Sequence, residues 1–342
     1  MISTTISLFG ASAVQRLLAF TVAVGLIIAP GIGAIAQSVD ALPSWRDGDV
    51  KQAIERFVAD VTTEGGDDYV PPVDRIAVFD NDGTLWSEKP WVQGLFLEQL
   101  LRNAAGRHPQ LSDEQPYKAA LAHDREYFET GGIRVMIEAI KAARVELSRD
   151  DFDAEVAEFF GTARHPGLNV PMSQTVYQPA IELLDYLRAN GFKTYICSGG
   201  GVDFMRMISS DFYGIESDQV IGTSYQKELH LVDGTWELLT TSELNPINNK
   251  DQKAVNIDLH IGKRPLLVMG NEGGRGDIGM MRYSQGRKGA SLQLLINHDD
   301  EAREFAYAED DNASLNAAKE NGWVVISMKD DWSVIYPSGG ER

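Results

Sequence analysis

Four groups of polar residues in this sequence combine carboxylates, a hydroxyl, glycine-rich backbone and a lysine. Carboxylate oxygens are ligands that Mg²⁺ prefers, and both the backbone amides of glycine-rich turns and the ammonium of lysine bind phosphate oxygens. The combination therefore suits the handling of a phosphoryl group beside a divalent cation. The groups are Asp80-Asn81-Asp82-Gly83-Thr84-Leu85, Ser198-Gly199-Gly200-Gly201, Lys253, and the segment Asn271 to Asp277.

Short apolar runs separated by helical patterns must position these groups. Apolar runs bounded by turn residues are typical of buried parallel strands. Strands that alternate with helices predict an α/β fold, with a parallel sheet and helices on both faces. Ligands bind such sheets at the carboxyl ends of the strands, so we expect the polar groups to meet at one edge. The predicted strands are 75–79, 193–197, 265–269, 292–296 and 324–328; the predicted helices are 45–61, 178–190 and 202–209, with a mostly helical block over 90–165 and a hairpin-like stretch over 221–239.

The composition excludes two classes of partner. The chain has 342 residues, with 31 basic and 50 acidic side chains, and its formal net charge is −19. This charge opposes binding to the phosphates of nucleic acid and to anionic membrane surfaces. Cys197 is the one cysteine of the sequence, so no internal disulfide can form.

The first 36 residues have the pattern of a secretory signal peptide. Arg16 precedes a largely apolar run, Leu17 to Ala29, and the segment ends in the small-x-small sequence Ala34-Ile35-Ala36. We therefore predict cleavage before Gln37 and export to the periplasm or the medium, with no stable membrane partner afterwards. The alternative is an uncleaved membrane anchor, which the short run and its interruption by Pro30-Gly31 disfavour.

The order of the polar groups resembles that of the four motifs of the haloacid dehalogenase superfamily, and the serine-glycine-glycine form of the second resembles its phosphoserine phosphatase-like branch. The matching segments are Phe79 to Leu85, Ile196 to Gly200, Lys253-Ala254, and Gly270-Asn271 through Asp277-Ile278. The resemblance covers about residues 73–300. It implies a Rossmann-like catalytic core at 73–89 and 175–342 and a mainly helical cap at 90–174, preceded by an N-terminal helix and linker at 37–72.

The residues and the resemblance together assign chemical roles. A carboxylate held in line can attack phosphorus, which fits Asp80, and Asp82 would act as general acid and then as general base. We expect Lys253 to offset the charge of the phosphoryl group and the nucleophile. The candidates for substrate binding are Ser198, Gly199, Gly200 and Thr84, although Thr84 fits a turn hydroxyl equally well. The resemblance gives Asp80, the Asp82 carbonyl, Asn271 and Asp277 as the candidates for binding Mg²⁺.

The fourth motif departs from the family pattern. Asn271 stands where the family has its first acid, and Glu272 is a candidate replacement; Arg275 fits either a substrate contact or an exposed loop position. Lys250 competes with Lys253 for the third motif. Two further residues are expected to be structural, Cys197 in a buried strand and His298.

The sequence therefore predicts an exported Mg²⁺-dependent phosphomonoesterase that acts on a small phosphorylated metabolite. Phosphoserine and phosphocholine are suggestions that come from the family alone. The alternatives are a dehalogenase-like hydrolase, which Asp82 opposes because dehalogenases lack this aspartate, and a non-catalytic binding protein that retains the fold. The pattern gives no prediction of the oligomeric state.

Overall fold

A computed structural model of the chain describes residues 40–143 and 147–337. The predicted signal peptide and its cleavage site before Gln37 lie outside these residues. The chain divides into Met1–Val39 and a second unit, Asp40–Arg342, and everything below concerns the second unit. In the described part of the chain, no helix combines the length and the apolar character needed to cross a membrane.

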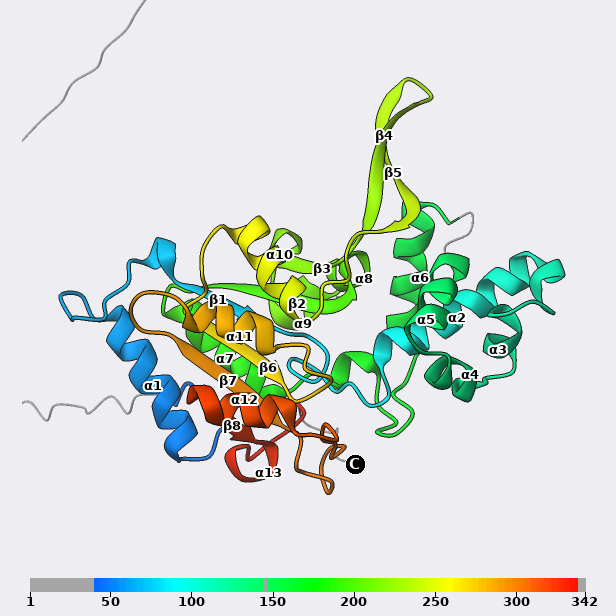
Figure 1. The fold of residues 1–342 in the computed structure, drawn as a ribbon. Coiled ribbons are helices and arrows are strands. Elements are labelled where there is room, and N and C mark those ends of the chain that lie inside the picture. Colours follow the sequence, from blue (N-terminus) through cyan, green and yellow to red (C-terminus); the bar gives the residue numbers. More distant parts are fainter. Residues whose placement is uncertain (1–39, 144–146, 338–342) are drawn as a thin grey trace, which may run out of the picture. The chain divides into compact units, whose positions relative to one another are not determined.

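The core of this unit is a six-stranded sheet with the order β3-β2-β1-β6-β7-β8, in which every pairing is parallel (Figure 1). The predicted α/β class is therefore confirmed. Because β1 lies between β2 and β6, the chain segments that follow these three strands are neighbours. The strands are β1 Ile76–Phe79, β2 Lys193–Gly201, β3 Val220–Thr223, β6 Leu267–Asn271, β7 Leu292–Asn297 and β8 Val324–Ser327.

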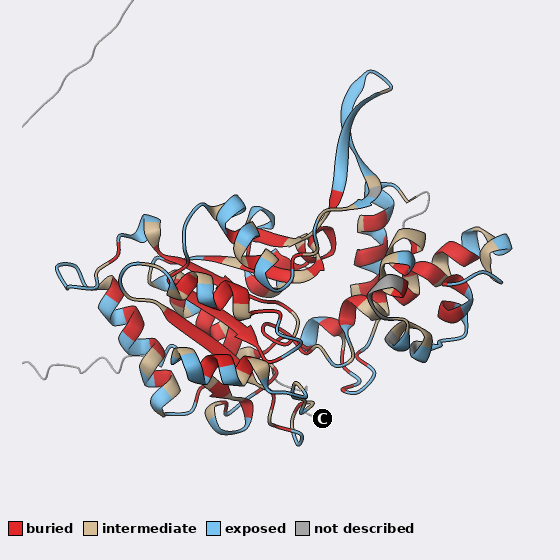
Figure 2. Ribbon diagram, in the orientation of Figure 1, coloured by how far each residue is buried: buried red, intermediate tan, exposed pale blue. Residues whose placement is uncertain are grey.

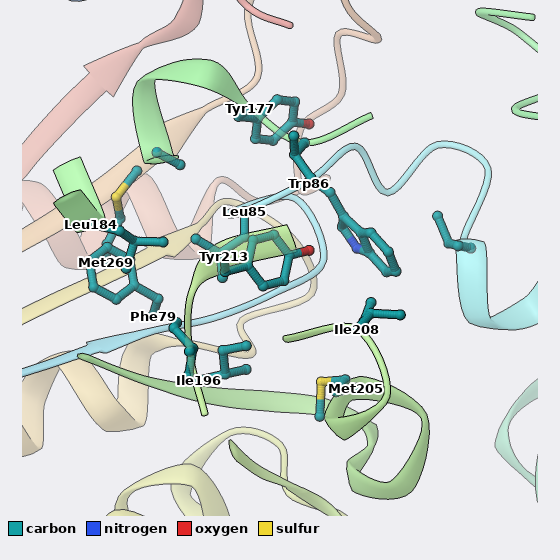
Figure 3. Packing of buried hydrophobic residues seen from close by; sticks show 14 of the residues in the cluster. Phe79, Leu85, Trp86, Tyr177, Leu184, Ile196, Met205, Ile208, Tyr213 and Met269 are labelled. Atoms are coloured by element: carbon teal, nitrogen blue, oxygen red, sulfur yellow. The ribbon is translucent and has the colours of Figure 1, made fainter. Parts of the chain in front are cut away.

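Helices cover both faces of the sheet, as the sequence predicts. Alternate residues of β1 point to opposite faces, so Ile76 and Val78 pack on one side, whereas Ala77 and Phe79 pack on the other. Figure 3 shows Phe79 grouped with Leu184 and Met269 on the second side. The first side is covered by α10 Asp251–Ile261, α11 Ile278–Gln285 and α12 Ala313–Asn321, and the second by α1 Asp49–Thr62, α7 Gln178–Ala189 and the short helices α8 Val202–Arg206, α9 Ser209–Tyr213 and α13 Met328–Asp331.

The predicted strand limits differ from the observed ones by one or two residues in β1, β6, β7 and β8 and most in β2. β2 does not end at Cys197 but continues through the glycines to Gly201, which pairs with Thr223 of β3. Glycine has low strand propensity, yet the register of β2 against β3 shifts between Cys197 and Gly201, and glycine suits such an irregularity. The serine-glycine segment is therefore part of the strand end rather than a loop after it.

The block between β1 and β2 is helical, as predicted. The side chain of Ser148 accepts from the backbone of Asp151, and the Asp151 side chain accepts in return, which fixes the start of α6. The chain leaves and re-enters the core side by side, because the backbone N–H of Tyr177 donates to Leu85 O at 2.9 Å. The cap helices are α2 Val92–Arg107, α3 Tyr117–Leu121, α4 Arg125–Thr130, α5 Gly132–Ala143 and α6 Arg149–Thr162.

The predicted hairpin is displaced along the chain. Residues 220–223 belong to the main sheet as β3, and the hairpin consists of β4 Tyr225–Val232 and β5 Thr235–Leu244, which form a separate two-stranded sheet. Asp233 and Gly234 both have positive φ, as a two-residue hairpin turn requires. Figure 2 shows that most of the hairpin is exposed.

Candidate active site

The four polar groups of the sequence meet at the carboxyl edge of the sheet. They line one cavity of about 200 Å³, formed by the ends of β1, β2 and β6 and by the start of α10. Parallel neighbouring strands end at the same edge, which is why segments far apart in sequence come together here. The lining residues are Asp80, Asp82, Glu88, Trp91, Ser198, Gly199, Gly200, Ile247, Asn249, Lys253, Asn271, Gly273, Gly276 and Asp277.

A buried lysine lies between two carboxylates in the wall of this cavity. Lys253 Nζ donates to Asp80 Oδ1 at 2.6 Å and to Asp277 Oδ1 at 2.5 Å, and all three side chains are buried. Burial would lower the pKa of Lys253, but Asp277 and Asp80 outweigh it and hold that pKa above its ordinary value. Burial and the charge of Asp277 raise the pKa of Asp80 well above the usual carboxyl range, despite Lys253.

The start of α10 explains why Lys253, and not Lys250, occupies this position. Lys250 precedes the helix with a φ of 55° and is exposed, whereas Lys253 lies in the first turn and points inward. The loop before the helix is tied to β2, because the buried Asn248 side chain donates to Ser198 O at 2.8 Å. Of the two lysines, the structure therefore brings Lys253 to the site.

Asp82 is held by a tryptophan on the same loop. Trp86 Nε1 donates to Asp82 Oδ1 at 2.7 Å. Burial raises the pKa of Asp82 to about 6, although the hydrogen bond from Trp86 acts in the opposite direction. A carboxyl group with such a pKa exchanges protons readily near neutral pH, as a general acid and base must.

The loop of the first motif passes directly against Asn271. Gly83 has a φ of +73°, and a Cβ at this position would lie 2.1 Å from Asn271 Nδ2. His298 also holds this loop, because its Nε2–H donates to Gly83 O at 2.9 Å. Asn271 Nδ2 also contacts Glu88 Oε1 at 3.4 Å and Tyr307 Oη at 3.2 Å. His298 thus has the structural place that the sequence predicted.

The end of β2 brings a hydroxyl and backbone amides to the same cavity. Ser198 Oγ accepts from the Gly200 N–H at 3.1 Å, and Gln93 Oε1 of the cap accepts from the Gly201 N–H at 2.8 Å. A Cβ on Gly200 would lie 1.9 Å from Gln93 Nε2, so a side chain at this position would displace the Gln93 amide.

Other predicted residues lie away from the cavity. Thr84 is fully buried and is not among the lining residues. Glu272 is also buried and accepts from the Glu309 N–H at 3.1 Å. Arg275 is exposed and pairs with Asp311. Burial raises the pKa of the Cys197 thiol to about 12, which agrees with a structural residue in β2.

Sequence reasoning missed several residues of this cavity. Glu88 and Trp91 closely follow the first motif along the chain, and Asn249 lies just before Lys253. Proximity to the motifs was the available signal for these three. Gln93 does not line this cavity but contacts Gly201 at its edge. Nothing in the local sequence predicted this contact, because it spans more than one hundred residues.

The residues present fit a divalent cation with oxygen ligands. No three His, Cys, Asp or Glu side chains among the described residues converge on a metal position. Mg²⁺, however, is commonly bound by one or two carboxylates together with waters and substrate phosphates. Asp80, Asp82, Asn271 and Asp277 line the same cavity, and Asp277 Oδ2 accepts from the Asn271 N–H at 2.9 Å. This set is the oxygen-rich kind that Mg²⁺ requires.

Solved structures that match this chain have low sequence identity to it. A conserved functionally unknown protein from Anaerococcus prevotii DSM 20548 matches with a TM-score of 0.51 and 14% identity over 81% of this chain and 91% of that chain. A protein of unknown function from Bordetella pertussis Tohama I has a TM-score of 0.46 and 15% identity over 74% and 97%. A phosphoserine phosphohydrolase-like protein from Francisella tularensis has a TM-score of 0.38 and 17% identity over 74% and 94%.

No curated protein matched the sequence. The family model of the haloacid dehalogenase-like hydrolases matches residues 77–270, more than half of the chain, from β1 to the fourth motif. The match spans the first three motifs in order, and the structure places their polar residues in one cavity. The chain therefore belongs to the haloacid dehalogenase-like hydrolases.

Proposed function

We propose that the protein is an exported, Mg²⁺-dependent phosphomonoesterase that works through an aspartyl-phosphate on Asp80. The observation that carries this proposal is the position of Lys253, which is buried between Asp80 and Asp277 beside the amides of the Ser198 segment. A carboxylate, an ammonium and the hydroxyl of Ser198 on one cavity match the charge distribution of phosphoryl transfer.

In the first half-reaction, Asp80 attacks phosphorus and the bond to the ester oxygen breaks. Lys253 holds Oδ1 of Asp80, which leaves Oδ2 as the attacking oxygen. Protonated Asp82 gives its proton to the departing oxygen, so the alcohol leaves neutral. In the second half-reaction, Asp82 takes a proton from water as the water attacks phosphorus. The bond to Asp80 then breaks, and inorganic phosphate and the free carboxylate are released.

Positive charge and hydrogen-bond donors stabilise the phosphoryl group through both steps. The ammonium of Lys253 and the segment Ser198 to Gly200 line the cavity that would hold it. Mg²⁺, held by Asp80, the Asp82 carbonyl, Asn271 and Asp277, would keep Asp80 ionised and offset charge on the phosphoryl oxygens. Because the protein is strongly acidic overall, this local positive charge is needed to attract an anionic substrate.

The domain organisation and the location follow from the same proposal. Residues 73–89 and 175–342 would form the catalytic core, residues 90–174 the cap that selects the substrate, and residues 37–72 the N-terminal helix and linker. Residues 1–36 would be removed on export. The substrate would be a small-molecule phosphate ester.

The experiment is phosphate release from a panel of phosphomonoesters with and without Mg²⁺. We expect Asp80→Asn to abolish turnover and Asp82→Asn to slow it by roughly a hundredfold, the scale for losing a general acid. Lys250→Met is the matched control for these changes, since this charged residue is exposed outside the cavity. Normal phosphate release by Asp80→Asn would refute the mechanism, and halide release from haloacids by the wild-type protein would favour a dehalogenase.

A further inference from the structure

A second cavity opens directly beside the catalytic one. Its volume is about 220 Å³, and it lies between the cap helices α2, α5 and α6 and the end of β2. Trp91, Gly199, Gly200 and Ile247 line both cavities, so the two cavities adjoin at the end of β2. The lining residues are Trp91, Gln93, Phe96, Leu97, Leu100, Met136, Ile137, Ile140, Ala143, Phe152, Gly199, Gly200, Gly201, Phe204, Thr223, Tyr225, Leu244 and Ile247.

The walls of this cavity are apolar. None of the described residues that line it carries a charge. Phe96 packs against Phe204 with ring centroids 5.0 Å apart and against Phe152 at 5.7 Å, so the aromatic wall is supported from both cap and core. A charged group placed here would lose its hydration without gaining an ionic partner, which is costly. The chemistry of the cavity therefore favours a neutral, apolar ligand group.

One polar atom on the wall is left without a partner. Gln93 is 8% exposed, and its Nε2 has no hydrogen-bond partner among the described residues, while its Oε1 accepts from the Gly201 N–H. The amide lies against Gly200, at the boundary between the two cavities. A buried donor without an acceptor is destabilising, and an oxygen of a ligand at this boundary would satisfy it.

From these observations we infer that the substrate is the phosphate monoester of a neutral, largely apolar alcohol or phenol. This inference rests on the proposed phosphatase activity. The phosphate binds at Ser198 and Lys253, the apolar group fills the cavity of the cap, and an oxygen at their junction accepts from Gln93 Nε2. A dry cavity of about 150 Å³ holds benzene, so a cavity of this size has room for roughly nine non-hydrogen atoms.

The inferred substrate differs from the two substrates that the family suggests. Phosphoserine would bring an ammonium and a carboxylate into a cavity whose described lining residues offer no charged partner for either. Phosphocholine is a closer competitor, because Trp91, Phe96 and Tyr225 are aromatic and aromatic faces attract quaternary ammonium ions. Because no carboxylate is found among the described lining residues, the cavity favours the neutral group.

The first experiment measures kcat/KM for a series of n-alkyl phosphates from methyl to octyl. Each methylene that the cavity buries should raise kcat/KM about fourfold, which corresponds to about 0.8 kcal/mol, until the cavity is full. Turnover that does not depend on chain length would overturn the inference while leaving the proposed phosphatase intact. If no phosphate ester is hydrolysed, or if Asp80→Asn retains activity, the proposed function itself fails.

The second experiment separates shape from charge. 3,3-Dimethylbutyl phosphate is the neutral carbon analogue of phosphocholine, so the two differ mainly in one positive charge. We expect 3,3-dimethylbutyl phosphate, whose alkyl group is neutral, to have the higher kcat/KM by about tenfold or more. Phosphoserine should be the poorest of the three. A preference for phosphocholine would overturn the inference and assign the cavity to a quaternary ammonium.

The third experiment changes the cavity wall. Ile137 is half-buried on α5 and lines the cavity, and Ile137→Asn should lower the ratio of kcat/KM for pentyl phosphate over methyl phosphate about tenfold. Leu121→Asn is the matched control, because Leu121 is a cap residue that is 43% exposed and does not line the cavity. This control should leave the ratio unchanged. Equal effects of both substitutions would show that the cap acts only through its stability.

Discussion

Replacing Lys253 by methionine tests the arrangement on which the candidate site depends. Lys253 is 2% exposed and contacts Asp80 at 2.6 Å and Asp277 at 2.5 Å, so its removal leaves two buried carboxylates facing each other. Breaking a buried ion pair by removing one partner costs about 3–5 kcal/mol of unfolding free energy. Methionine keeps most of the volume of the lysine stem, so loss of packing adds little.

The loss of unfolding free energy caused by Lys253→Met should depend on pH in a known direction. Lys253 lowers the pKa of Asp80, so its removal raises that pKa further above its unfolded value of about 3.9. A carboxyl group with a raised pKa binds more protons in the folded state, and stability then falls as pH rises through the interval between the two values. The loss of unfolding free energy in Lys253→Met should therefore be smaller at pH 5 than at pH 8.

Urea denaturation at the two pH values measures this difference. Adding Asp277→Asn removes one of the two facing carboxylates and should recover a large part of the loss at pH 8, because the Asn271 N–H can still donate to the new amide oxygen. A loss below about 1 kcal/mol at pH 8 is typical of a surface pair and would refute the buried arrangement. Equal losses at pH 5 and pH 8 would refute the electrostatic reasoning.

The remaining predictions concern the metal and the N-terminus. Asn271→Asp should lower the half-saturating Mg²⁺ concentration, because a full charge binds the ion more strongly than an amide does. For the same reason, adding Mg²⁺ should raise the melting temperature of the variant more than that of wild type. Without Mg²⁺ the variant should melt at a lower temperature than wild type, since the new carboxylate would face Glu88. An unchanged Mg²⁺ dependence would remove Asn271 from the metal site. N-terminal sequencing of exported protein should find Gln37 first, and a chain that still begins at Met1 and sediments with membranes would indicate an anchor.

Sequence patterns determined the fold class and the four groups of the site. The alternation of strands and helices, and the order of the motifs, are properties of short segments, so they can be read without coordinates. The limits of β2 were predicted less well, because Ser198 to Gly201 continue the strand through pairing with β3, a non-local contact. The hairpin was displaced for a similar reason, since Val220 to Thr223 pair with β2 rather than with the following residues.

Tertiary structure alone decided which side chains meet. Lys253 contacts Asp80 across 173 positions of sequence, and its choice over Lys250 follows from the place where α10 begins. Trp86, His298 and Gln93 hold the motif residues from the first-motif loop, the segment after β7 and the cap, and none of the three belongs to a motif. The apolar cavity is likewise a product of packing, because its walls come from segments between Trp91 and Ile247 whose helical spacing indicates only that they are buried.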